Sequence, residues 1–276
     1  ELLHHLHSLG YVGGGNVKKD FSFDQSKEDP KDLIGFHNDF KKVLHLGEQN
    51  RIDDARALGE RLLKQRPLSE LYALLLKIAV KQRDYGNAIR YGEKTLEVLS
   101  GRFNVHQDLG IAYVHTRQNE AAAKQFELAL EFMPKDETVF LAERTRVHNQ
   151  LGVIRNRQNK FELAIVQFEE TLKLDPKQPQ MLNALAWILA TCPDQALRDP
   201  SKALELARQA CDLTQSKHPV YLNTLALAYA MLNNFSEAVK TSEKALALAQ
   251  AKGDRRLAAD LQKQLDHLKL KVPAAH

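Results

Sequence analysis

The chain has few of the residues that interrupt helices and few cysteines. It contains 13 glycines and 9 prolines among 276 residues, about 8% together, compared with roughly 12% in average usage. Collagen-like, mucin-like and disulfide-scaffold proteins are therefore excluded. Hydrophobic residues make up 43% of the chain, which excludes disorder as the main state because enough apolar surface is available to offset the ordering entropy. We expect a mostly helical protein.

The chain also lacks a strong charge of either sign and a long apolar run. Lys and Arg number 39 against 35 Asp and Glu, and so small a surplus does not indicate a nucleic-acid partner. The densest apolar stretches, 71–80 and 181–190, are too short to cross a bilayer, so no membrane insertion is expected. No signal peptide is visible. Because the first residue is Glu1, we expect a fragment or a processed product.

Residues 103–136 contain a helical repeat. Small and large residues alternate at fixed positions and a proline closes the segment: Leu109, Gly110, Tyr113, Ala122, Phe126, Ala129 and Pro134. This spacing resembles the 34-residue tetratricopeptide repeat. The resemblance implies an all-α fold, in which helix–turn–helix units stack into a right-handed superhelix. It also implies that ligands lie in a concave groove lined by the first helix of each unit.

The template recurs along the chain. The small residue of the second helix returns, at separations of 33 to 42, as Ala55, Ala88, Ala122, Ala164, Ala203 and Ala238. Six units follow, at about 36–68, 69–102, 103–136, 145–178, 179–218 and 219–252. Eight extra residues at 137–144 have good helix propensity and predict a first helix longer by two turns in the fourth unit. The prolines of segment 191–200 predict a surface loop in the fifth unit.

The two ends of the chain differ from the repeats. After Gly253, Asp254 is a predicted N-cap for a helix with one leucine stripe, which is typical of a solenoid cap. Residues 9–14 resemble the closing segment of bacterial sulfatase-like hydrolases, which implies a catalytic domain upstream and a periplasmic or secreted protein; otherwise we expect a cytoplasmic one. The expected division is a terminal helix and linker over 1–28, a solenoid over 29–252 and a cap with tail over 253–276.

No catalytic constellation is present, so we expect a protein that is not an enzyme and that has no cofactor and no metal site. The sulfatase nucleophile motif C-x-P-x-R does not occur. His4, His5 and His7 lack further ligands and are interpreted as part of a terminal helix. Cys192 lies in a turn and Cys211 well inside a helix, more than about 10 Å apart along the axis. This exceeds the roughly 7 Å Cα limit for a disulfide, so two free thiols are predicted.

The remaining function is binding of a protein or peptide. The fifth position of three successive units is asparagine: Asn149, Asn183 and Asn223. Such a row of amides could hydrogen-bond the backbone of an extended peptide; alternatively, asparagine is only tolerated at a half-exposed position. Trp187, at the ninth position, is either an apolar anchor for a ligand side chain or part of ordinary helix packing.

Four basic residues map to the same groove: Lys77, Lys81, Arg146 and Arg157. They favour an acidic peptide or a C-terminal carboxylate, unless they only form a solvated charged face. The leading hypothesis is thus a protein-interaction scaffold. The alternatives are an accessory domain of a sulfatase-like hydrolase and, less favoured, a helical-repeat RNA binder.

Overall fold

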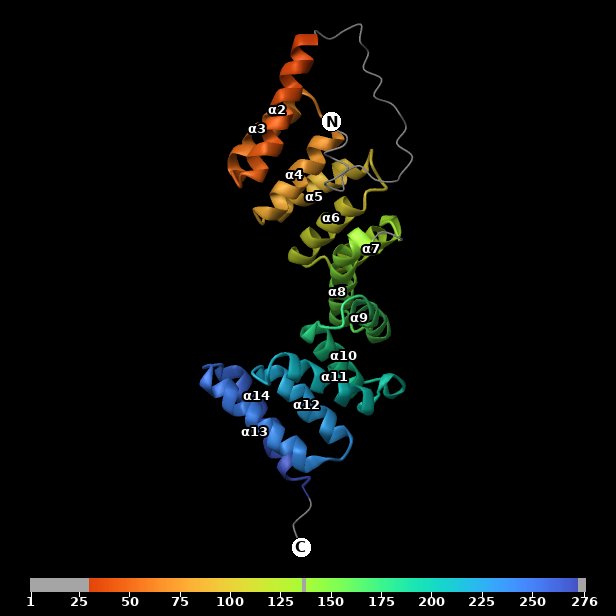
Figure 1. Cartoon of the computed structure of the whole chain (residues 1–276), viewed down its shortest axis with the longest axis vertical. Coiled ribbons are helices and arrows are strands. Elements are labelled where there is room, and N and C mark those ends of the chain that lie inside the picture. The colour runs from red at the N-terminus through yellow and green to blue at the C-terminus, as the bar shows by residue number, and fades with distance from the viewer. Residues whose placement is uncertain (1–29, 136–137, 273–276) are drawn as a thin grey trace. The chain divides into compact units, whose positions relative to one another are not determined.

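The computed structural model describes residues 30–135 and 138–272, and within them every regular element is a helix (Figure 1). The chain divides into two compact units, residues 1–147 and 148–276. The helices of unit 1 are α2 (Pro30–Glu48), α3 (Ile52–Gln65), α4 (Ser69–Lys81), α5 (Tyr85–Leu96), α6 (Phe103–His115) and α7 (Asn119–Phe132). Helix α8 (Leu141–Arg157) begins in unit 1 and ends in unit 2. The other helices of unit 2 are α9 (Phe161–Leu174), α10 (Pro179–Thr191), α11 (Pro200–Leu213), α12 (Pro219–Met231), α13 (Phe235–Ala251) and α14 (Arg255–Lys269).

The helices form six consecutive pairs, one for each expected repeat, so the predicted all-α helix-pair class is confirmed. Five of the pairs share one turn, in which a single residue has a φ near +60°: Asn50, Arg83, Arg117, Asn159 and Asn233. In each turn the next backbone N–H donates to a carbonyl five residues earlier, as from Asp84 to Ala79. This bond satisfies a carbonyl at the end of the first helix and reverses the chain into the second.

The small residues of the repeat lie where the helices of a pair approach most closely. All six predicted alanines of the second helices are fully buried. In the first helices, a Cβ atom added at Gly110 would lie 2.9 Å from the ring of Phe126, and one added at Gly152 would lie 2.6 Å from the ring of Phe168. A glycine facing a phenylalanine therefore lets the two backbones pack closely without a cavity.

In the first two repeats the glycine lies on the second helix and faces the next repeat, not the other helix of its own pair. Gly59 of α3 and Gly92 of α5 occupy the positions that Phe126 and Phe168 hold later. A Cβ atom at Gly59 would lie 2.8 Å from the side chain of Leu75, and one at Gly92 would lie 3.1 Å from that of Leu109. Leucines of the following first helix thus fill the space beside these glycines.

The fourth repeat differs from its prediction. Helix α8 has 17 residues where α4, α6, α10 and α12 have 13, so it is longer by one turn and not by two. A short 3₁₀ helix, Thr138–Phe140, precedes it. The ring of Phe140 packs edge-on against Phe103 at 5.1 Å, and the Arg144 guanidinium donates to the carbonyl of Pro134. These contacts hold the inserted residues against unit 1.

The predicted loop and cap are both present in unit 2. The segment between α10 and α11 contains one 3₁₀ turn and exposed residues, and the Asp199 carboxylate caps α11 by accepting from the N–H of Lys202. Helix α14 begins after its predicted N-cap, Asp254, and packs against α13. Its leucines Leu261, Leu265 and Leu268 are buried. The expected residues 1–28 lie outside the described part of the chain, and the three-part division stays a prediction.

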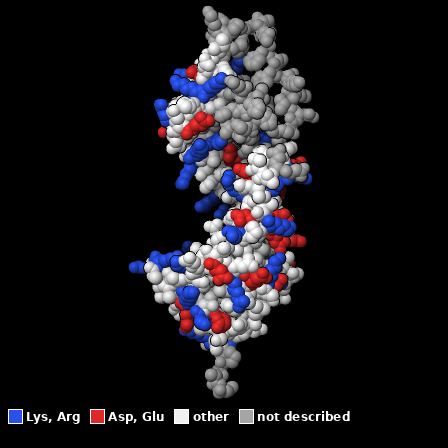
Figure 2. All heavy atoms as spheres, viewed as in Figure 1, with Lys and Arg blue, Asp and Glu red and all other residues white. Residues whose placement is uncertain are grey.

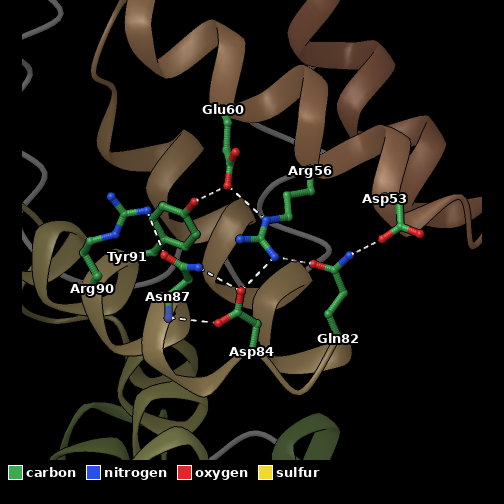
Figure 3. A network of polar contacts seen from close by, with 8 residues as sticks. All are labelled: Asp53, Arg56, Glu60, Gln82, Asp84, Asn87, Arg90 and Tyr91. Carbon is green, nitrogen blue, oxygen red and sulfur yellow. Dashed lines mark hydrogen bonds and ion pairs between the residues drawn. The ribbon is translucent and has the colours of Figure 1, made fainter.

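A network of polar contacts joins the second helices of the first two repeats (Figure 3). The Arg56 guanidinium of α3 contacts the Glu60 carboxylate at 2.9 Å and the Asp84 carboxylate at 2.7 Å. The Tyr91 hydroxyl of α5 donates to the same Glu60 carboxylate at 2.7 Å. Hydrogen bonds from Arg56 and then from Tyr91 lower the pKa of Glu60, and hydrogen bonds led by that from Asn87 lower the pKa of Asp84.

The lowered pKa values predict a specific loss of stability in acid. The folded state holds the Glu60 and Asp84 carboxylates below their ordinary pKa values of 4.5 and 3.8. Their contribution is therefore present above about pH 4.5 and lost as the pH falls through the folded values. Because these side chains are 31–40% exposed, we expect roughly 1 kcal/mol in total. Urea unfolding of wild type and Arg56→Gln at pH 7 and 3.5 would measure it, and the acid-dependent loss should be smaller in the variant.

A matched control is available on α5. Lys94 pairs with Glu97 at 2.8 Å, and both side chains are more than half exposed. Lys94→Gln should leave the difference between pH 7 and pH 3.5 at the wild-type value. An equal acid sensitivity in wild type and Arg56→Gln would show that the network does not contribute.

Candidate functional site

Two first helices of unit 2, α10 and α12, lie in the same register. Helices α10 and α12 each begin at a proline, have 13 residues and contact one another. Proline suits the first helical position because its missing N–H would have no partner there. The equal starts place Asn183 beside Asn223 at the fifth position and Trp187 beside Leu227 at the ninth.

The two asparagines of this register have unused hydrogen-bonding capacity. Asn183 and Asn223 are half-buried, and the Oδ1 atom of each is buried without a hydrogen-bond partner in the described structure. The Oδ1 atom of Asn156, near the end of α8, has the same status. Asn149, the third predicted asparagine, is half-buried on α8. The register of α10 and α12 therefore carries two unpartnered carbonyl acceptors, one on each helix. Asn156, at the twelfth position of its unit, was not selected by the sequence analysis.

Large apolar side chains are exposed beside this row. Trp187 is 39% exposed and Met231, at the last position of α12, is 38% exposed. Trp187 therefore presents part of its ring to solvent, and its role as an apolar anchor stays a prediction. A pocket of about 400 Å³ opens at the C-terminal ends of α10 and α12, next to α14.

Two of the predicted basic residues of unit 1, Lys77 and Arg146, lie near a carboxylate that the sequence analysis did not select. Lys77 of α4 is half-buried and Arg146 of α8 is exposed. Burial raises the pKa of Asp108, on α6, to about 6, and the positive charges of Lys77 and Arg146 oppose that rise. Asn104, one turn earlier on α6, has both carboxamide atoms buried without a hydrogen-bond partner. Asp108 could not be selected from the sequence because its position relative to α4 and α8 depends on the stacking.

The other predicted cations lie at helix ends. Lys81 is exposed at the end of α4 in unit 1, and Arg157 is exposed at the end of α8 in unit 2. Figure 2 shows Lys and Arg side chains gathered along one edge of unit 1, whereas in unit 2 both signs are interspersed. Since Asp108 adds a negative charge among the cations of unit 1, the expected preference for an acidic ligand stays a prediction.

Comparisons with known proteins agree with this architecture. A tetratricopeptide-repeat family model matches residues 220–252, the sixth expected unit. A comparison with curated protein sequences finds no match. Among solved structures, YrrB, described as a TPR protein with an unusual peptide-binding site, is 16% identical, with a TM-score of 0.61 over 74% of this chain and 97% of that chain.

Two further structures are similar. PilF of Pseudomonas aeruginosa is 18% identical, with a TM-score of 0.58 over 83% of this chain and 97% of that chain. The MamA protein is 18% identical, with a TM-score of 0.56 over 68% of this chain and 94% of that chain. The chain has the tetratricopeptide fold. The resemblance of residues 9–14 to sulfatase-like hydrolases lies outside the described residues.

The tetratricopeptide fold is typical of scaffolds that bind other proteins, and it is not typical of enzymes. In the described residues, no group of three or more His, Cys, Asp or Glu side chains could hold a metal ion. Cys192 and Cys211 are buried free thiols, as predicted, and burial raises the pKa of Cys211 to about 11. None of the described helices is both long and apolar enough to span a bilayer.

Proposed function

We propose that this chain is a scaffold that binds an extended segment of another protein along α10 and α12 of unit 2. The observation that supports this proposal most directly is the pair of buried, unpartnered Oδ1 atoms of Asn183 and Asn223 at the same register of two adjacent helices. A buried acceptor without a partner costs about 1–3 kcal/mol. A ligand that supplies N–H donors at both positions would remove that cost on binding.

An extended backbone has the donors that this surface needs. In such a segment, backbone N–H groups recur at regular intervals along one edge, so two carboxamide oxygens can accept from it without reading its side chains. Trp187 then provides an apolar surface for one ligand side chain. The peptide-binding site named for YrrB belongs to a protein of the same fold, which supports a peptide as the ligand class here.

The basic residues define a second part of the proposal. Lys77, Lys81 and Arg146 of unit 1 would favour an acidic ligand at that unit, and Asp108 would weaken that preference above pH 6, where its carboxyl is ionised. Arg157 of α8 would act in the same sense in unit 2. These contacts would change the association rate and its salt dependence more than the final affinity.

The proposal predicts a loss of binding without a loss of stability. Peptides of 12 residues, selected on the wild-type chain from a random library, should bind the double variant Asn183→Ala, Asn223→Ala at least about tenfold more weakly, since two hydrogen bonds of about 1 kcal/mol each are lost. Trp187, the single tryptophan, allows titration by intrinsic fluorescence. The melting temperature should fall by no more than about 2 °C.

A control double variant, Gln209→Ala with Gln250→Ala, removes two exposed carboxamides from the second helices α11 and α13. It should bind the selected peptides as tightly as wild type does. Unchanged affinity in the asparagine variant, or a melting temperature lowered in step with affinity, would contradict the proposal and assign the asparagines to structure.

A further inference from the structure

The pocket beside α14 has an apolar floor and a polar rim. Its apolar lining comes from α12, α13 and α14, with Leu227, Met231, Phe235 and Leu268 as the large side chains. Its volume of about 400 Å³ is near the lower end of the roughly 300–1,000 Å³ found for ligand pockets. A single amino-acid residue fits such a volume better than a large cofactor does.

The rim carries hydrogen-bond donors and positive charge. The Nε2 atom of Gln264 is buried without a hydrogen-bond partner. The Lys271 ammonium lies 6.0 Å from the centre of the Phe235 ring, and His267 is on the same side of α14. None of the described residues that line the pocket is acidic. The rim is therefore complementary to an anionic hydrogen-bond acceptor.

Two lysines near the end of α14 differ in their ion pairs. Lys269 pairs with the Glu243 carboxylate of α13 at 2.9 Å, whereas Lys271 forms no ion pair in the described residues. A carboxylate that approached the rim would thus meet one buried amide donor and one cation that no carboxylate of the described residues neutralises.

We propose that this pocket binds the C-terminal residue of a peptide partner that ends in a large apolar side chain. The side chain would occupy the floor, and the α-carboxylate would accept from Gln264 and lie near Lys271. An internal Asp or Glu side chain fits less well, because its carboxylate would have to enter the apolar floor and lose its hydration. This inference deepens the proposed function by naming the chemistry of the partner, and it uses residues other than Asn183 and Asn223.

Methionine methyl groups give a direct test with internal controls. The three methionines are Met231, which lines the pocket, and Met133 and Met181, which are 2% and 5% exposed elsewhere. In the full chain labelled with ¹³C at the methionine methyl groups, N-acetyl-L-phenylalanine should shift the Met231 signal in a saturable manner and leave the other two unmoved. Met231→Leu assigns the signal.

The carboxylate is tested with an uncharged probe and a matched pair of variants. N-acetyl-L-phenylalaninamide, which lacks the charge, should bind at least about fivefold more weakly than the acid. Lys271→Gln should weaken binding of the acid by a similar factor and leave binding of the amide unchanged. Lys269→Gln should change the affinity for neither probe. Circular dichroism confirms that both variants are folded.

The inference would be overturned if the Met231 signal did not shift, or if the acid and the amide bound with equal affinity. It would also be overturned if dodecanoate saturated the pocket at a lower concentration than N-acetyl-L-phenylalanine does, because the pocket would then be assigned to an acyl chain. These one-residue probes do not span α10 and α12 at the asparagine register. If the probes do not bind the pocket, the tenfold effect expected of the asparagine variant can still be observed. If the asparagine variant binds peptides as wild type does, the result at the pocket still holds.

Discussion

Replacing Phe168 with alanine is expected to lower the free energy of unfolding by about 3–5 kcal/mol, the cost of deleting a fully buried aromatic ring. Phe168 of α9 has no exposed surface, and its ring lies against Gly152 of α8. Because this ring fills the space beside Gly152, its removal leaves a cavity. Urea unfolding followed by circular dichroism would measure the effect.

Val166 provides the control for this prediction. It lies on the same helix but is 46% exposed, so Val166→Ala should change the free energy of unfolding by less than about 0.5 kcal/mol. A loss of less than 1 kcal/mol for Phe168→Ala would mean that α8 and α9 close over the vacated space, and that this ring does not set their separation.

The reverse change, a larger residue at Gly152, is expected to destabilise the chain by about 1–3 kcal/mol through overpacking. The added Cβ atom of Gly152→Ala would lie 2.6 Å from Cε1 and 2.7 Å from Cδ1 of Phe168, closer than carbon atoms approach. This cost exceeds the roughly 1 kcal/mol that alanine gains over glycine in a helix interior. Thermal or urea unfolding would show a net loss.

Two further variants separate the clash from helix propensity. Gly35 of α2 is exposed and has no atom within 4 Å of an added Cβ, so Gly35→Ala should raise the free energy of unfolding by up to about 1 kcal/mol. Combining Gly152→Ala with Phe168→Leu should recover part of the loss, since the two changes act on one contact. Additive losses would show that the glycine is not required by the ring.

Some features of the fold could be predicted from local spacing. The six alanines that mark the second helices are all fully buried, and Asp254 caps α14 as expected. These predictions succeeded because each depends on contacts within one helix pair or one turn, which recur at a fixed separation in the chain. The prediction failed in the fourth repeat, where the insertion makes a 3₁₀ helix with Phe140 packed on Phe103.

The resemblance to tetratricopeptide repeats assigned Asn183, Asn223 and Trp187 to one surface, and their role in binding stays a prediction. The equal starts of α10 and α12 place Asn183 at the same register as Asn223 on adjacent helices. The buried state of the Oδ1 atoms and the exposure of Trp187 could not be predicted, because each depends on how closely the next helix approaches. The pocket on α14 was missed for the same reason.

The amino-acid sequence by itself determined the helix pairs, their turns and the positions of their small residues, because these depend on side chains within one helix pair or one turn. Only the tertiary structure decided which polar groups meet across repeats. Arg56 reaches Asp84, Asp108 lies near Lys77 and Arg146, and Gln264 lines a pocket with Met231. Such pairs join residues about 30 or more positions apart on helices of different repeats. The distance between their side chains depends on the angle between those helices, which no local sequence pattern predicts.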